Sequence, residues 1–90
     1  MINLKNKSVV VTGGTKGIGA EIAKTFLRHE ANVIVLARQK PNRVIKARGN
    51  KARFIECDIR NIQSLDSAVH IIKKEYRSVD ILINNAGGAP

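Results

Sequence analysis

Residues 8–19 constrain the fold more than any other stretch, because they join a strand pattern to a helix pattern through four glycines. The β-branched residues at 9–12 run directly into glycines at positions 13 and 14. Further glycines stand at 17 and 19, where apolar residues begin to recur at helical spacing. A sharp strand-to-helix turn directs backbone N–H groups and the positive end of the helix dipole at one place. Because glycine has no Cβ atom, a phosphate can approach the main chain there, and the stretch predicts a pyrophosphate-binding turn.

Two well-known phosphate-binding motifs do not match this turn. A mononucleotide P-loop has Lys and then Ser or Thr directly after its last glycine, whereas Gly19 is followed by Ala20 and Glu21. The dinucleotide fingerprint Gly-x-Gly-x-x-Gly would need a third glycine at position 22, which is Ile22. The pattern that is present is Thr-Gly-x-x-x-Gly-x-Gly, beginning at Thr12.

The rest of the chain predicts strands that alternate with helices. The expected strands are the short apolar runs 7–12, 33–37, 53–57 and 79–83. The expected helices are 17–28 and a second helix with Asn61 as its N-cap. Between 38 and 52 we expect a loop with about two helical turns. Right-handed crossovers give the strand order 3-2-1-4, so the predicted fold is α/β: a Rossmann-like parallel sheet with helices on both faces, a truncated doubly wound fold.

Composition excludes several other classes. Ninety residues, 43% of them hydrophobic, allow one small domain. No apolar run approaches the roughly 20 residues of a membrane span, and the first residues lack the apolar core of a signal peptide, so we expect a cytoplasmic protein without a membrane partner. A single cysteine, Cys57, excludes an internal disulfide. Two separated histidines, His29 and His70, are too few to predict a metal site.

One segment accounts for most of the net charge of +9. Between 38 and 53 the sequence has no acid and seven basic residues, namely Arg38, Lys40, Arg43, Lys46, Arg48, Lys51 and Arg53. The other nine basic and seven acidic residues give only +2. Such a segment can hold an anionic group of a ligand, follow a nucleic-acid backbone, or form a solvated loop.

Three places along the chain jointly resemble the short-chain dehydrogenase/reductase family. They are the glycine turn 12–19, Asp58 with Ile59 after the third expected strand, and Asn-Asn-Ala-Gly at 84–87 after the fourth. All three match in order and spacing. The resemblance covers essentially the whole chain, but it corresponds to the amino-terminal half of a family member. Residues 1–90 are therefore expected to form a partial NAD(P)-binding Rossmann domain without its catalytic half, as a fragment or a truncated gene product.

The resemblance implies a nicotinamide dinucleotide bound across the carboxyl ends of the strands. The residues implied around its pyrophosphate and adenosine are Gly13, Thr15, Lys16, Gly17, Ile18 and Gly19. Asp58 and Ile59 would border the adenine, with the carboxylate accepting from the exocyclic amine. Asn85, Ala86 and Gly87 would line the ribose through main-chain contacts. Two of these sites have a simpler interpretation as well, because Asp58 could be only a turn acid and Asn84-Asn85 could only tie strands together.

The charges beside the second strand favour NADP(H) over NAD(H). An NAD site places a carboxylate about 20 residues after the glycines, where it bonds the ribose 2′-hydroxyl and would repel a 2′-phosphate. The sequence has no acid between Glu30 and Glu56. Lys16 and Arg38 instead resemble the basic pair of NADP-preferring members. Two charge-assisted hydrogen bonds would favour NADP on the order of 100-fold or more, unless both side chains are simply solvated.

The family's catalytic residues have no counterpart in this sequence. Its members use a Tyr-x-x-x-Lys pair, but the only tyrosine here is Tyr76, which is followed four residues later by Asp80. Tyr76 also continues the apolar stripe of its expected helix. We therefore assign no catalytic residue. The expected function is the NADP(H)-binding portion of an oxidoreductase that transfers hydride between the nicotinamide and a carbonyl or alcohol substrate, with the substrate itself unpredicted and the chain alone not catalytic.

Two functions of other classes remain open. The basic segment 38–53 could bind nucleic acid or another polyanion, but the only aromatic residue beside it, Phe54, belongs to an expected strand. The segment thus offers no stacking platform, and nucleic acid is the less favoured partner. Alternatively, the chain could be a non-catalytic interaction module. The open edge of the fourth strand would then be covered by self-association or by a carboxy-terminal half.

Overall fold

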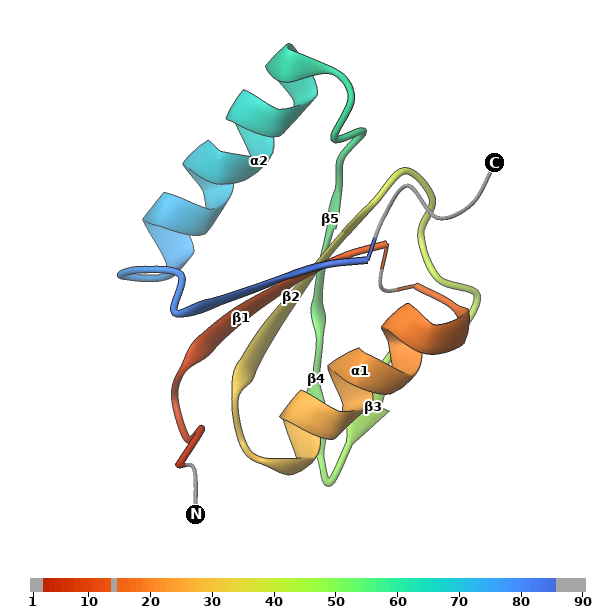
Figure 1. The fold of residues 1–90 in the computed structure, drawn as a ribbon, viewed down its shortest axis with the longest axis vertical. Coiled ribbons are helices and arrows are strands. Elements are labelled where there is room, and N and C mark those ends of the chain that lie inside the picture. Colours follow the sequence, from red (N-terminus) through yellow and green to blue (C-terminus); the bar gives the residue numbers. More distant parts are fainter. Residues whose placement is uncertain (1–2, 14, 86–90) are drawn as a thin grey trace.

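The computed structural model describes residues 3–13 and 15–85. Four parallel strands form one sheet in the order β5-β2-β1-β6 (Figure 1). Their bounds are β1 (Ser8–Thr12), β2 (Asn32–Ala37), β5 (Arg53–Glu56) and β6 (Ile81–Asn84). The helices are α1 (Gly17–Arg28) and α2 (Ile62–Glu75). Counted along the chain, this is the predicted order 3-2-1-4, so the predicted topology is confirmed.

The two helices cover opposite faces of the sheet, and two separate cores result. One core lies against α1 and includes Val9, Val11, Ala23, Leu27, Val33 and Val35. The other lies against α2 and includes Val10, Ile34, Leu36, Ile55, Ala68 and Ile72. Successive side chains of a strand point to opposite faces, so a strand covered on both faces is apolar along its central residues, as β1 is at 9–11 and β2 is at 33–36. The predicted helices on both faces are confirmed.

The start of β6 differs slightly from the prediction. Val79 was expected to begin this strand, but the strand begins at Ile81, after Asp80. The Asp80 amide donates to the Ser8 carbonyl at 2.9 Å, and the Asp80 carboxylate accepts from the Ser8 amide at 2.9 Å. This pair of bonds anchors the start of β6 beside the start of β1.

The segment between β2 and β5 contains a small antiparallel hairpin, β3 (Lys46–Ala47) with β4 (Asn50–Lys51). The prediction of helical turns here was wrong. Arg48 and Gly49 both have positive φ, 52° and 83°, as a two-residue type I′ turn requires. Ile45 is buried against α1, and the Ala52 amide donates to its carbonyl at 2.8 Å. A turn and one anchoring side chain therefore replace the expected helical turns.

No helix within the described part of the chain is long and apolar enough to cross a membrane.

Candidate functional site

An open pocket of about 680 Å³ lies at the carboxyl ends of the strands. The residues that follow β1, β2 and β5 line it, because the ends of parallel strands meet at one edge of the sheet. It brings together seven of the predicted cofactor residues: Gly13, Thr15, Lys16, Arg38, Asp58, Ile59 and Asn85. Gly17, Ile18 and Gly19 form the first turn of α1, directly after Lys16. Ala86 and Gly87 lie outside the described residues.

The first turn of α1 has free backbone amides. A helix leaves its first N–H groups without intrahelical acceptors, and a side chain at the N-cap usually accepts from one of them. The N-cap of α1 is Lys16, which has no acceptor atom and makes no capping bond. Among residues 3–13 and 15–85, no acceptor bonds the amides of Gly17, Ile18 or Gly19. These amides are therefore free to bind an anion.

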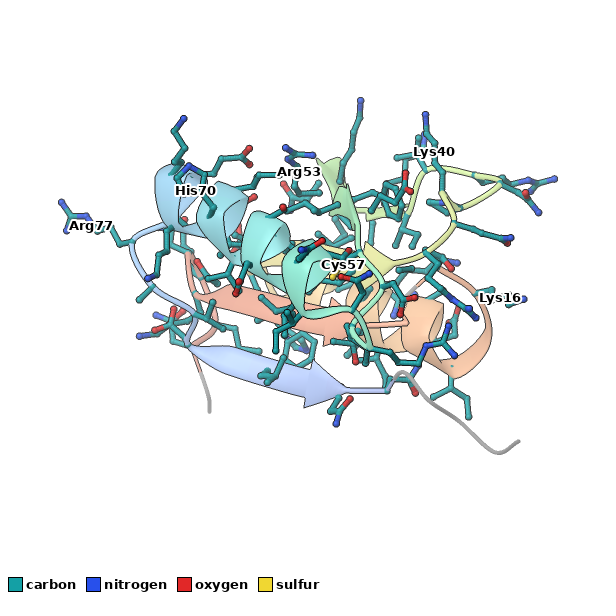
Figure 2. The ribbon with its side chains drawn as sticks, turned by 90° about the horizontal axis from the view of Figure 1, so that it is seen from above. Lys16, Lys40, Arg53, Cys57, His70 and Arg77 are labelled. Carbon is teal, nitrogen blue, oxygen red and sulfur yellow. The ribbon has the colours of Figure 1, made fainter. Side chains whose placement is uncertain are left out.

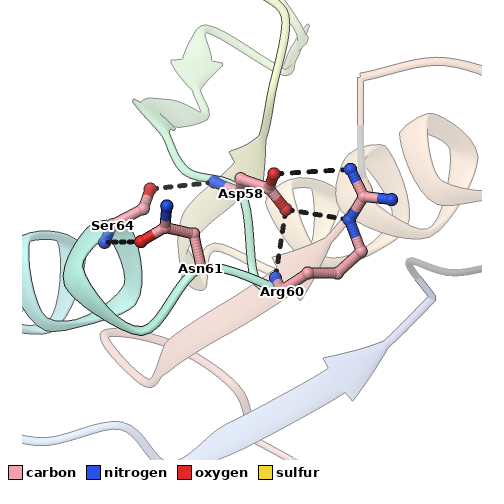
Figure 3. Close-up of polar contacts among 4 residues, drawn as sticks. All are labelled: Asp58, Arg60, Asn61 and Ser64. Atoms are coloured by element: carbon pink, nitrogen blue, oxygen red, sulfur yellow. Dashed lines mark hydrogen bonds and ion pairs between the residues drawn. The ribbon is translucent and has the colours of Figure 1, made fainter.

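The other helix shows what a capped N-terminus looks like in the same chain. Asn61 is the N-cap of α2, as predicted, and its side-chain oxygen accepts from the Ser64 amide at 3.1 Å (Figure 3). The Ser64 hydroxyl in turn accepts from the Asp58 amide at 2.9 Å. The two helices differ because of the residue at the N-cap: the asparagine side chain has an oxygen acceptor and the lysine side chain has none.

Two glycines of the turn play different roles. The Gly13 amide donates to the Leu36 carbonyl at 2.7 Å, which extends the pairing of β1 with β2, so this amide is not free for a ligand. Gly17 has a φ of 60°, and a Cβ atom added to it would meet no described atom within 4 Å. Any other residue would be strained at this φ, and its side chain would project into the open space beside the free amides.

Two cations border the pocket and come from different elements. Lys16 directly precedes α1, with an exposed side chain (Figure 2). Arg38 directly follows β2 and is exposed as well. Neither takes part in an ion pair with another described residue. The charge of Arg38 does reach Asp58 and lowers the pKa of its carboxyl group as a minor contribution.

Asp58 has an intramolecular partner that the sequence analysis missed. Its carboxylate accepts three bonds from Arg60, from Nε at 3.2 Å, from Nη2 at 3.4 Å and from the backbone amide at 3.0 Å (Figure 3). The Arg60 guanidinium holds the pKa of Asp58 below its ordinary value, and the backbone bond lowers it further. The backbone bond is the Asx-turn pattern, two residues apart, and this pattern was the only signal that could have identified Arg60. The carboxylate that the resemblance assigned to an adenine amine is therefore already bonded to Arg60.

Asn84 and Asn85 join the end of β6 to the end of β1. The Thr12 hydroxyl donates to the Asn84 side-chain oxygen at 3.1 Å and accepts from the Asn85 amide at 3.0 Å. The Asn85 side chain donates to the Gly13 carbonyl at 3.2 Å. These bonds tie β6 to β1 and fix the glycine turn relative to β6.

Tyr76 lies far from this pocket. It follows α2 and packs against the core on that face, and it lines a smaller pocket of about 240 Å³ at the amino ends of the strands with Asn6, Glu30 and Lys51. Burial raises the pKa of its phenol. Among the residues that the structure describes, no group of three or more His, Cys, Asp and Glu residues is placed to hold a metal ion.

A sequence model of the family described as short chain dehydrogenase matches residues 7–90. The chain belongs to this family. A curated member, Short-chain dehydrogenase reductase 3a of Arabidopsis thaliana, is 34% identical over 89 residues, which cover 96% of this chain and 35% of that protein. Oxidoreductase UcpA of Escherichia coli K12 is 36% identical over 91 residues, which cover 97% of this chain and 35% of that protein. The chain thus spans about a third of the length of these members of the short-chain dehydrogenase family.

Solved structures of short-chain dehydrogenases share the fold. Ligand-free aldohexose dehydrogenase of Thermoplasma acidophilum superposes with a TM-score of 0.81 at 38% identity, over 93% of this chain and 31% of that chain. An NADH-dependent reductase, A1-R′, complexed with NAD, gives a TM-score of 0.83 at 30% identity, over 94% of this chain and 38% of that chain. The second of these structures contains a nicotinamide dinucleotide.

Proposed function

We propose that the chain is the NADP(H)-binding portion of a short-chain oxidoreductase, which transfers hydride between the nicotinamide and a carbonyl or alcohol group of its substrate. One observation carries the proposal: two cations without an ion pair to any described residue border the pocket at the carboxyl edge of the sheet, and three free helix amides directly follow one of them, Lys16. Residues 1–90 would then be part of a dinucleotide-binding domain, and the described residues would bind and orient the cofactor.

The pyrophosphate would bind at the start of α1. Its oxygens would accept from the free amides of Gly17, Ile18 and Gly19, which stand at the positive end of the helix dipole. The side chain of Ile18 is 75% exposed, although isoleucine is normally buried in a domain of this kind. A bound dinucleotide would cover this side chain and remove it from water.

The 2′-phosphate of NADP would lie between Lys16 and Arg38. Both cations border the pocket, and the residues that end β2 and follow it, Ala37, Arg38 and Gln39, include no carboxylate that would repel this phosphate. Each charge-assisted hydrogen bond contributes about 1.5–3 kcal/mol before a reduction for solvent exposure, so the preference for NADP over NAD should be on the order of 100-fold.

Calorimetric titration of the chain with NADP⁺ and with NAD⁺ tests this proposal. We expect NADP⁺ to bind on the order of 100-fold more tightly, with a difference that decreases as salt is added, because the preference is electrostatic. Equal affinities for the two dinucleotides would contradict the assignment of NADP. Failure of both to bind would contradict the proposed cofactor site itself.

A further inference from the structure

The hairpin β3–β4 carries a compact group of cations on a fixed platform. Its residues 46–51 are Lys-Ala-Arg-Gly-Asn-Lys, and the hairpin lies beside α1 (Figure 1). The Asn50 side chain donates to the Leu27 carbonyl at 3.5 Å, and Ala47 packs against the core beneath α1. Ala47 and Asn50 therefore face α1. Because neighbouring residues of a strand point to opposite sides, Lys46 and Lys51 point away from the helix.

The placement of these cations opposes local stability. Lys46 and Lys51 are directly opposite each other in the antiparallel pair, and both are exposed. Like charges in this arrangement repel. Arg48 occupies a turn position with a φ of 52°, where asparagine or glycine is strongly preferred. The hairpin thus breaks two local rules within six residues, at the positions that carry its charge.

No described carboxylate neutralises this group. The ion pairs among residues 3–13 and 15–85 are Lys24–Glu21, Arg53–Glu75 and Arg60–Asp58, and none includes a cation of the hairpin. Glu30 lines the small pocket at the amino edge together with Lys51, but no ion pair joins them. The Arg48 guanidinium donates to the Arg28 carbonyl at 3.4 Å. Arg28, at the end of α1, is therefore a fourth cationic residue beside the hairpin.

We propose that residues 46–51 form a docking surface for the phosphodiester backbone of nucleic acid. Phosphates along one strand would lie between the lysine pair and Arg48 and would relieve their mutual repulsion. The outward face of this hairpin has no aromatic or large apolar side chain for a hydrophobic contact with a protein or a membrane. The missing stacking platform disfavoured nucleic acid in the sequence, but contacts to the phosphodiester backbone do not require stacking. Binding of this kind is electrostatic and independent of sequence.

This surface is separate from the proposed cofactor site. The nucleotide pocket is lined by residues at the carboxyl ends of the strands, whereas Lys51 lines the pocket at their amino ends. Nucleic acid and NADP⁺ should therefore bind independently. The inference stands even if the cofactor proposal fails, since it uses none of the same residues.

Fluorescence anisotropy with labelled 20-nucleotide DNA and RNA, as single strands and as a DNA duplex, tests the proposal across a series of salt concentrations. The variant combines Lys46→Ala, Arg48→Asn and Lys51→Ala, because asparagine suits the turn and the hairpin should stay folded. We expect its affinity to fall at least about 10-fold and the slope of log affinity against log salt to become shallower by about 2 to 3. Its melting temperature should not decrease, since the repulsion has been removed.

The matched control removes the same charge from α2 and the residues after it, through Lys73→Ala, Lys74→Ala and Arg77→Ala (Figure 2 shows Arg77 extending away from the end of α2). Its affinity should stay within about twofold of the original. An equal loss in both variants would show that only net charge matters and would overturn the proposal. So would displacement of the labelled strands by NADP⁺, or equally tight binding of polyaspartate. If the hairpin variant does not fold, Lys46→Gln with Lys51→Gln is compared with Lys73→Gln and Lys74→Gln, so that each variant loses two charges.

Discussion

Replacing Arg38 by alanine should weaken the binding of NADP⁺ about 10-fold or more and leave the binding of NAD⁺ within about twofold. Arg38 follows β2 and borders the nucleotide pocket, and no described carboxylate pairs with its guanidinium. Its loss would remove one charge-assisted hydrogen bond to the 2′-phosphate, and about 1.4 kcal/mol corresponds to a factor of ten. Titration calorimetry on the original chain and the variant, with each dinucleotide, measures both effects.

A matched control is Arg43→Ala. Arg43 belongs to the same basic segment and is exposed, but it does not line the pocket. The control should bind both dinucleotides as the original chain does. If Arg38→Ala and Arg43→Ala lose NADP⁺ affinity equally, the basic segment acts only through its total charge. If Arg38→Ala weakens both dinucleotides alike, the guanidinium does not contact the 2′-phosphate.

Replacing Leu27 by alanine should lower the free energy of unfolding by about 3 kcal/mol or more. Leu27 is 1% exposed and packs between α1 and the sheet. Truncation of a buried leucine removes apolar contacts and leaves a cavity, at a cost of about 2–5 kcal/mol. A domain of 90 residues has a total stability of roughly 5–13 kcal/mol, so this single change removes a large fraction of it.

Leu82→Ala provides the comparison for Leu27→Ala, because Leu82 is 63% exposed on β6 and the chemical change is identical. Urea unfolding followed by circular dichroism should show a loss below about 1 kcal/mol for this variant. Similar losses at both positions would mean that α1 does not pack on the sheet through Leu27, and the position of the free amides relative to the strands would then be in doubt.

Where the pattern in the sequence is strong, the prediction and the structure agree. The valine run and the strict helical spacing after it predicted β1 to within a residue and the bounds of α1, Gly17–Arg28. The cap at Asn61 was predicted because asparagine has the required acceptor. The strand order followed from crossover handedness alone. Apart from the strand order, each of these features rests on local chemistry that a short window of sequence contains.

The features that the sequence did not predict depend on contacts or on uncommon backbone conformations. The hairpin turns at Arg48-Gly49, and an arginine with positive φ has no sequence signal comparable to Asn-Gly. The bonds between Arg60 and Asp58 depend on how the turn after β5 folds. The free amides of α1 could be expected from Lys16, since lysine cannot cap a helix, whereas the pairing of the Gly13 amide with Leu36 required the structure.

The central claim is that the uncapped start of α1 holds the phosphates of a nicotinamide dinucleotide. Titration of the ¹⁵N-labelled chain with NADP⁺, followed through the backbone amide resonances, tests it most directly. We predict the largest shifts at the amides of Gly17, Ile18 and Gly19, with smaller ones at Arg38 and Asp58 and none at the carboxyl end of α2 near Glu75. Shifts confined to the hairpin 46–51, or no change at the three amides of α1 at saturation, would contradict the claim.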